Sequence, residues 1–223
     1  MTYQFDFGAI IGYWPMMLHG IAITAELTLF GTLLGIAVSV LGGWARTSGK
    51  LWLNLPVTVY VELIRNTPFI VQLFFIFFGL PALGLRLDAV DASILAMVVN
   101  LGAYGTEIVR AGLIATPRGQ IEAGASLGLS KPQIFWYVVL APSLARIWPA
   151  LASQVVIVML GSSVCSQISV QELTYVASYI QSRSFRAFEA YFVVTALYLV
   201  LALALRQALL LAGRHLFKGV QAR

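Results

Sequence analysis

Residues 121–142 read IEAGASLGLSKPQIFWYVVLAP, a polar stretch set between long apolar runs. Gly128 interrupts this stretch, and Ser130 with Gln133 has the spacing of a capping box, which marks the start of a helix. Thr116 and Pro117 supply a matching start further upstream. The sequence therefore predicts two short helices that are bent at Gly128.

The residues before the bend suit a docking surface. Glu122 offers a charge to a partner, and small residues at Ala123, Gly124, Ala125 and Gly128 would let another backbone approach closely. An ordinary solvated connection between two helices has the same composition, so these residues alone leave both interpretations open.

The same residues resemble the EAA loop of permease subunits of ATP-binding-cassette importers, which forms a coupling helix in a cleft of the ATPase. Glu122, Ala123 and Gly128 match the motif of that family, and Gly124 stands in place of its second alanine. The family continues with Ile-x-Leu-Pro, whereas Pro142 comes one residue late here and leaves the start of the next helix open. The resemblance implies a cytoplasmic loop at about residues 116–142. Within it, the residues expected to couple to the ATPase are Glu122, Ala123, Gly124, Ser126, Leu127 and Gly128.

Composition independently places the chain in a membrane. Hydrophobic residues make up 60% of the chain and charged residues 10%, and the mean hydropathy is +0.87, whereas soluble domains use roughly 25% charged residues. A span needs about 20 mostly apolar residues, and the shorter intervals reach that length only if flanking charges snorkel. The uncharged intervals are Leu27 to Ala45, Asn66 to Leu85, Ala92 to Thr106, Ile147 to Gln171 and Ala190 to Leu205. We expect an all-α integral membrane protein with about five transmembrane helices in a single domain, residues 1–223; a soluble helical protein would show polar helix faces.

The positions of Lys and Arg predict the orientation. Cytoplasmic connections are enriched in these residues. They gather after the first, third and fifth intervals: Arg46, Lys50 and Arg65; Arg118, Lys131 and Arg146; Arg206, Arg214, Lys218 and Arg223. The opposite connections hold only Arg86, Arg183 and Arg186. The amino terminus should therefore lie outside and the carboxyl terminus inside, which puts residues 121–142 in the cytoplasm.

Several other functions find little support. The net charge of +5 comes from basic residues scattered at helix ends, which favours anionic lipid headgroups over nucleic acid as the electrostatic partner. Cys165 is the single cysteine, and His19 and His215 lie far apart, so we expect no disulfide, metal site or catalytic pair.

Two further absences follow from the sequence pattern. Met1 to Trp14 lacks a basic segment, so a cleaved signal peptide is not expected. The Gly49–Lys50 pair is followed by Leu51 and lacks the upstream glycine of a phosphate loop. ATP and Mg²⁺ should therefore be handled by a partner, with no cofactor bound by this chain.

The resemblance extends over nearly the whole chain, from about Trp14 to Leu216, and narrows to the permeases for polar amino acids of the histidine, glutamine and arginine type. The matching segments are Tyr60-Val61-Glu62, Arg65, Thr67-Pro68, Gln72 to Phe75, Phe78 to Pro81, Gly102-Ala103-Tyr104, Glu107, Arg110, Gly119-Gln120, Gln167 to Val170 and Glu172-Leu173. Each match is modest, but their order along the chain is specific.

Polar groups within the third span are candidates for the translocation path. Asn100, Tyr104 and Glu107 recur on one helical face, and ionisable groups in a span usually face protein or a water-filled path. Glu107 and Arg110 are three residues apart and can pair, which is the purely structural alternative. Asn100 and Tyr104 are therefore the stronger candidates.

Two other polar groups have structural alternatives. Glu62 and Arg65 share the same three-residue spacing, and Pro68 would free the carbonyl of Ile64, so a structural pair and a kink are expected there. Ser162, Ser163, Ser166 and Gln167 follow Gly161, where a broken helix could expose backbone groups to a substrate. Close packing of small residues is the alternative. The family usually carries Lys-Asp-Thr-Ser at positions 160–163, and both charges are missing here, so no preference for substrate charge carries over.

The resemblance thus implies a multi-pass permease subunit of the bacterial inner membrane that moves a polar amino acid. The resemblance implies a dimer of two such subunits, identical or paralogous, two ATPase subunits and an extracytoplasmic binding protein. A channel or carrier that needs no ATP is the alternative, and it should tolerate the loss of Glu122 and Gly128. A membrane enzyme would need a catalytic cluster that the spans do not offer.

Overall fold

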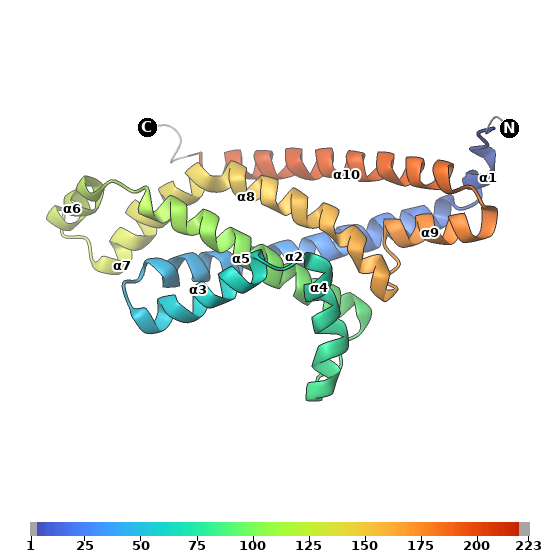
Figure 1. The fold of residues 1–223 in the computed structure, drawn as a ribbon. Helices are drawn as coiled ribbons and strands as arrows, with labels where there is room; N and C mark the ends of the chain where they lie inside the picture. Colours follow the sequence, from blue (N-terminus) through green and yellow to red (C-terminus); the bar gives the residue numbers. More distant parts are fainter. Residues whose placement is uncertain (1–3, 219–223) are drawn as a thin grey trace.

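A computed structural model describes residues 4–218, and this part of the chain forms an elongated helical body (Figure 1). Four helical runs are long and apolar enough to cross a membrane. These are α2 (Trp14–Thr47), α5 (Ala89–Ile114), the continuous run Lys131–Ile168, and α10 (Ala187–Leu216). Each exceeds the roughly 20 residues that a bilayer requires, so the helices extend beyond the hydrocarbon.

The expected second span, Asn66 to Leu85, is not one straight helix. α3 (Leu51–Arg65) ends before Pro68, and the chain continues as α4 (Phe69–Phe74), the π-helical η1 (Phe75–Gly79) and the 3₁₀-helical η2 (Leu80–Leu83). The two parts meet at 111°, and the second projects from the body as an arm (Figure 1). The kink expected at Pro68 is thus a complete break, because Pro68 adopts an extended conformation at the start of α4.

The fourth span is much longer than expected. It begins with α7 (Lys131–Gln133), passes through the π-helical η3 (Ile134–Leu140) and α8 (Ala141–Gly161), and ends with the 3₁₀-helical η4 (Ser162–Ile168). The second of the two short helices predicted around Gly128 is therefore the start of this span, which holds Pro142 in its interior. The chain also does not break at Gly161; it tightens into η4 and ends at Ser169, whose φ is 66°.

Three short helices lie at the two ends of the body. α1 (Gly8–Ile11) and α9 (Leu173–Ser184) lie at one end with the amino terminus, whereas α6 (Arg118–Ser126) lies at the other end (Figure 1). The connection between α2 and α3 lies toward the end with α6, as the predicted orientation requires. Arg223, one of the basic residues used for that prediction, falls outside the described residues.

The core is built around the contact between α2 and α5. Ser39 donates from α2 to the Leu101 carbonyl oxygen of α5 at 3.2 Å. A Cβ atom at Gly105 would overlap the Ser39 side chain, and one at Gly42 would overlap Thr106. Small residues therefore bring these two helices together closely, as is common between membrane helices.

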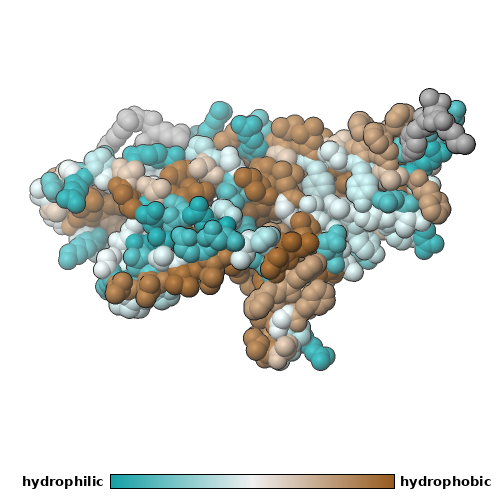
Figure 2. Space-filling model, in the orientation of Figure 1, coloured by the Kyte–Doolittle hydropathy of each residue, from teal (hydrophilic) through white to brown (hydrophobic). Residues whose placement is uncertain are grey.

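Apolar side chains are exposed over much of the body, as expected for contact with lipid or with another membrane subunit. Figure 2 shows this hydrophobic surface, including the projecting arm. Large exposed side chains of the arm include Phe75, Phe78 and Leu83.

Candidate coupling loop and transport cavity

Helix α6 forms the first half of the predicted coupling loop and ends as the sequence indicated. Gly128 has a φ of 77°, the left-handed region that glycine adopts most readily. The backbone N–H of Leu129 donates to the Gly124 carbonyl oxygen at 3.2 Å, and that of Gly128 donates to Ala125 at 3.0 Å. This is a Schellman motif, which closes a helix and turns the chain sharply.

The second helix start has the predicted capping box at Ser130 and Gln133. The backbone N–H of Ser130 donates to Gln133 Oε1 at 2.9 Å. The Schellman motif and the capping box fix the two sides of the four-residue connection from Leu127 to Ser130, so the bend has one defined geometry.

The outer surface of the loop differs in one respect from the expectation. Glu122 and Ala123 are exposed, and Leu127 is 81% exposed. Glu122 forms no ion pair or side-chain hydrogen bond with the described residues. Gly124, however, is buried, because it faces Ile134 of the following helix. Its small size therefore serves packing within the chain and not the approach of a partner.

The base of the loop is tied to the ends of two spans. The hydroxyl groups of Thr116 and Ser143 lie 3.1 Å apart, and Ser143 also donates to the Gly112 carbonyl oxygen at 3.0 Å. Arg146 donates to the Ala115 carbonyl oxygen at 3.1 Å. The end of α5 and the start of α8 are thus fastened to one another directly before α6 begins.

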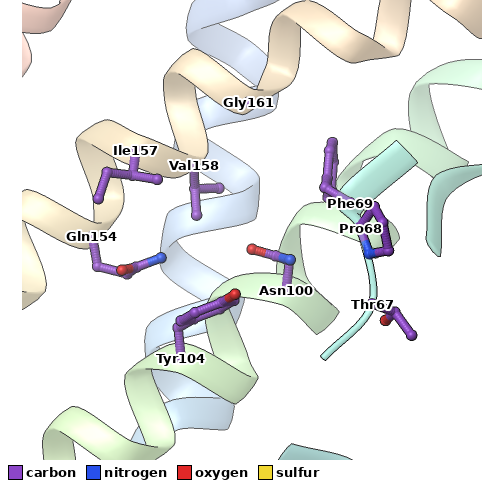
Figure 3. Close-up of a pocket in the computed structure, with 9 residues that line it drawn as sticks. All are labelled: Thr67, Pro68, Phe69, Asn100, Tyr104, Gln154, Ile157, Val158 and Gly161. Atoms are coloured by element: carbon purple, nitrogen blue, oxygen red, sulfur yellow. The ribbon is translucent and has the colours of Figure 1, made fainter. Parts of the chain in front are cut away.

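A cavity of 350 Å³ opens between α5, α8 and the break between α3 and α4. Figure 3 shows its lining residues: Thr67, Pro68, Phe69, Asn100, Tyr104, Gln154, Ile157, Val158 and Gly161. The amide groups of Asn100 and Gln154 point toward one another across it (Figure 3). None of the lining residues is charged, so the cavity offers neutral hydrogen-bonding groups beside apolar walls.

Gln72 stabilises the break between α3 and α4 through hydrogen bonds to backbone groups at the break and to α5. Its Nε2 donates to the carbonyl oxygens of Ile64 at 2.7 Å and Thr67 at 3.0 Å, and its Oε1 accepts from Asn100 at 3.0 Å. The Ile64 carbonyl, which the sequence left without a partner, is satisfied in this way. Sequence reasoning did not single out Gln72 for this role, because its partners lie on other elements.

The expected pair of Glu62 and Arg65 is wrong. Glu62 accepts from the side chain of Asn66 at 3.2 Å, whereas the Arg65 guanidinium group lies 5.5 Å from the centre of the Tyr104 ring. Tyr104 in turn donates to the Arg65 carbonyl oxygen at 3.4 Å. Arg65 therefore finds an aromatic partner across the helix interface instead of the carboxylate one turn away.

The expected ion pair between Glu107 and Arg110 is present, with 2.9 Å between Oε2 and Nη2. Arg46 of α2 joins it, with Nη1 2.7 Å from Glu107 Oε1. This cluster fastens α2 to α5. Glu107 does not line the cavity, so its part in the translocation path stays a prediction.

The polar run after Gly161 also lies outside the lining of the cavity. Ser162 is buried and donates to the Met159 carbonyl oxygen at 2.6 Å, while Ser163 is half-buried and Gln167 is exposed. Sequence reasoning missed Gln154, because a single glutamine in a span gives no motif. Among residues 4–218, no three His, Cys, Asp or Glu side chains gather as a metal site.

Comparison with known proteins places these features in a family. Residues 31–214 match the model of the binding-protein-dependent transport system inner membrane component. The chain belongs to this family. It is therefore the multi-pass inner-membrane permease component of such a transporter and not its ATPase, as the resemblance of the coupling loop implied.

The permease is similar along most of its length to permeases of named transport systems. It is 36% identical to the glutamine transport system permease protein GlnP of Escherichia coli K12, covering 91% of this chain and 93% of GlnP. It is 34% identical to the L-cystine transport system permease protein TcyB of Bacillus subtilis, covering 77% of this chain and 74% of TcyB.

Solved structures agree with the permease fold. A chain in the crystal structure of an amino acid ABC transporter with histidines matches with a TM-score of 0.85 and 32% identity, covering 96% of this permease and 100% of that chain. A chain of the MetNI methionine ABC transporter in an inward-facing conformation matches with a TM-score of 0.70 and 22% identity. The match covers 94% of this permease and 98% of the MetNI chain. The second match bears on the fold alone.

Proposed function

We propose that this permease carries a polar amino acid across the inner membrane, driven by two ATPase subunits and supplied by an extracytoplasmic binding protein. The cavity between α5, α8 and the break before α4 is the observation on which this rests. Its amide and phenol groups can hydrogen-bond a small polar solute within the membrane-spanning part of the chain. The relatives named for glutamine and L-cystine transport support the same class of substrate.

Neutral groups line the cavity, which favours substrates whose side chain is itself neutral. Gln154 forms no side-chain hydrogen bond with the described residues, so its amide is free for a substrate. Asn100 donates to Gln72, but its oxygen accepts no hydrogen bond from the described residues and faces the cavity (Figure 3). One free donor and one free acceptor are what a carboxamide needs.

The coupling loop provides the contact with the ATPase in this proposal. Glu122 and Leu127 are exposed on a loop whose base is bonded to α5 and α8, two of the elements that line the cavity. ATP and Mg²⁺ bind to the partner, and closure of the ATPase would move α6.

A second permease subunit completes the pathway in this proposal. The arm formed by α4, η1 and η2 carries Phe75, Phe78 and Leu83 away from the body with their side chains exposed. A second subunit would cover this arm and close the open side of the cavity, with membrane lipid around both subunits.

The test is reconstitution of the permease in proteoliposomes with the ATPase and binding protein encoded beside its gene. Uptake of radiolabelled L-glutamine, L-cystine and L-histidine is measured with and without ATP and with and without the binding protein. We expect uptake that requires both. Uptake without ATP would instead establish an uncoupled carrier.

A matched pair of variants tests the cavity. Gln154→Leu removes one free amide, and loss of a buried hydrogen bond of about 1 to 2 kcal/mol should reduce the efficiency of uptake roughly tenfold. Gln207→Leu makes the same chemical change on the exposed face of α10 and should leave uptake unchanged. Equal uptake by both variants would exclude Gln154 from the path.

A further inference from the structure

The turn between α9 and α10 holds Phe185 in an energetically unfavourable backbone conformation. Its φ is 56°, in the left-handed region that a bulky side chain adopts only under constraint. The side chain is nevertheless 87% exposed, more than any other large apolar side chain among the described residues. The fold thus gains little burial from Phe185, while glycine would fit the backbone there more easily.

The surroundings of Phe185 are polar. A groove of 440 Å³ beside it is lined by Ser178, Gln181 and Ser182, together with Ala187 and Tyr191. An exposed aromatic side chain next to hydroxyl and amide groups is typical of protein interfaces. Lipid tails could not satisfy those polar groups.

A positively charged residue, Arg183, follows Ser182 of this groove in the sequence. Arg183 is exposed and stacks on Tyr179, with 5.5 Å between its guanidinium carbon and the ring centre. It forms no ion pair with any carboxylate in the described part of the chain. A partner with acidic groups around an apolar pocket would complement both Arg183 and Phe185.

The location of the turn identifies the partner. It lies at the end of the body opposite α6 (Figure 1), which is the extracytoplasmic end in the predicted orientation. We infer that Phe185 is an anchor for the extracytoplasmic binding protein, with Arg183 facing an acidic rim on that protein. This inference rests on the proposed function, because it requires that such a protein delivers the substrate.

Two substitutions at one position separate docking from stability. Phe185→Gly removes the side chain and relieves the backbone, whereas Phe185→Ala removes the side chain and keeps the unfavourable φ. The assembled transporter in lipid nanodiscs is titrated with fluorescently labelled binding protein carrying the amino acid found in the uptake assay. Both variants should raise the Kd about tenfold or more. Phe185→Gly should also unfold at a higher temperature than Phe185→Ala, which shows that the lost affinity is not a loss of folding.

Two further variants complete the experiment. Phe192→Ala removes another exposed aromatic side chain at the same end of the molecule and should leave the Kd unchanged. Arg183→Gln should slow association and weaken its dependence on salt. A wild-type Kd for the Phe185 variants would overturn the inference, as would an equal loss in Phe192→Ala, which would indicate contact with the membrane. A cross-link from position 185 to a second permease copy would also overturn it.

The experiment also separates this inference from the proposed function. If wild-type transporter neither binds the binding protein nor takes up substrate with it, the proposed function fails and the inference fails with it. If wild type shows both activities and the Phe185 variants match it, only the inference fails.

Discussion

Glu172 carries a fully buried carboxyl group at the start of α9. It accepts hydrogen bonds from the backbone N–H of Thr174 at 2.9 Å and of Tyr175 at 2.8 Å, and the Tyr198 hydroxyl group also donates to it. Burial raises the pKa of the Glu172 carboxyl above its ordinary value, although these hydrogen bonds oppose the shift. The Glu172 carboxyl group therefore joins α9 to α10, and the free energy of burying it is less favourable when the group is ionised.

The unfavourable burial of the ionised Glu172 carboxyl group predicts that the stability of the permease depends on pH. Because the folded-state pKa of Glu172 exceeds the unfolded value near 4.5, the folded chain binds more protons between those two values. Stability from this group is present below the unfolded pKa and is lost as pH rises through the folded pKa. Glu172→Gln should lack this component, and its amide oxygen can still accept one of the two capping hydrogen bonds from backbone N–H groups.

The measurement is the unfolding temperature of the purified permease from pH 4 to pH 8 for both proteins. We expect the wild type to lose stability relative to Glu172→Gln as pH rises. Parallel profiles would show that the Glu172 carboxyl does not change protonation in this range.

Gly128 provides a second prediction at the scale of one residue. A Cβ atom there would meet no neighbour, so only its φ of 77° requires glycine. Gly128→Ala should destabilise the bent conformation of the loop by about 1 kcal/mol and should therefore lower the amount of substrate taken up per ATP hydrolysed. Gly128→Trp should uncouple uptake from ATP hydrolysis more fully. Gly119→Ala in α6 makes the same change without positive φ or a clash and serves as the control.

The ratio of uptake to ATP hydrolysis in proteoliposomes checks this prediction. The variants are compared at equal amounts of inserted protein. Normal coupling in Gly128→Trp would mean that the loop does not transmit the motion of the ATPase.

At the scale of elements, the contact between α2 and α5 depends on residues without side chains. Gly105→Ala would force Ser39 or the whole of α2 to move, and overpacking of this kind costs about 1 to 3 kcal/mol. Gly161→Ala, in α8, places the same methyl group where no atom lies within 4 Å. We expect a lower unfolding temperature for Gly105→Ala alone, measured by the loss of monodisperse protein after heating in detergent. Equal losses would mean that the helices adjust freely.

The sequence predicts the elements better than their ends and pairings. Apolar intervals locate the four long helices, and local signals at Gly128, Ser130 and Gln133 locate the bend of the coupling loop. Charged residues are unreliable markers of helix ends, because Arg146 lies well inside the fourth helical run, which begins at Lys131. The contact of Arg65 with Tyr104 joins residues far apart in sequence. Spacing along one helix therefore favoured the wrong partner, Glu62.

At the scale of the whole molecule, the predicted orientation places Leu127 and Phe185 on opposite sides of the membrane. These two residues have the most exposed large apolar side chains in the described part of the chain. Single cysteines at these positions, with Cys165→Ala as background, can be labelled with a maleimide that does not cross membranes. Position 185 should react in spheroplasts and position 127 only in inverted vesicles. The reverse result would invert the topology and remove the basis for the coupling loop.

The cavity shows what sequence reasoning reached at this scale and what it did not. Asn100 and Tyr104 were expected to line a path because ionisable and polar groups recur on one face of α5. Gln154 joins them only because α8 crosses α5 at that point, and Gln72 only because the chain breaks before α4. Those meetings depend on helix crossing, which leaves no local signal, and on the 111° angle of the bend, whereas Pro68 signals only that a bend is present.

The π-helical segment η3 connects the coupling loop to the fourth span. Each hydrogen-bonded turn of a π-helix contains one residue more than an α-helical turn, so the winding of η3 sets how α8 is rotated about its own axis relative to the coupling loop. If η3 were wound as an α-helix, the residues beyond it would be rotated by about 100°, and Gln154 would point away from the cavity. The winding of this junction therefore decides which face of the fourth span lines the path.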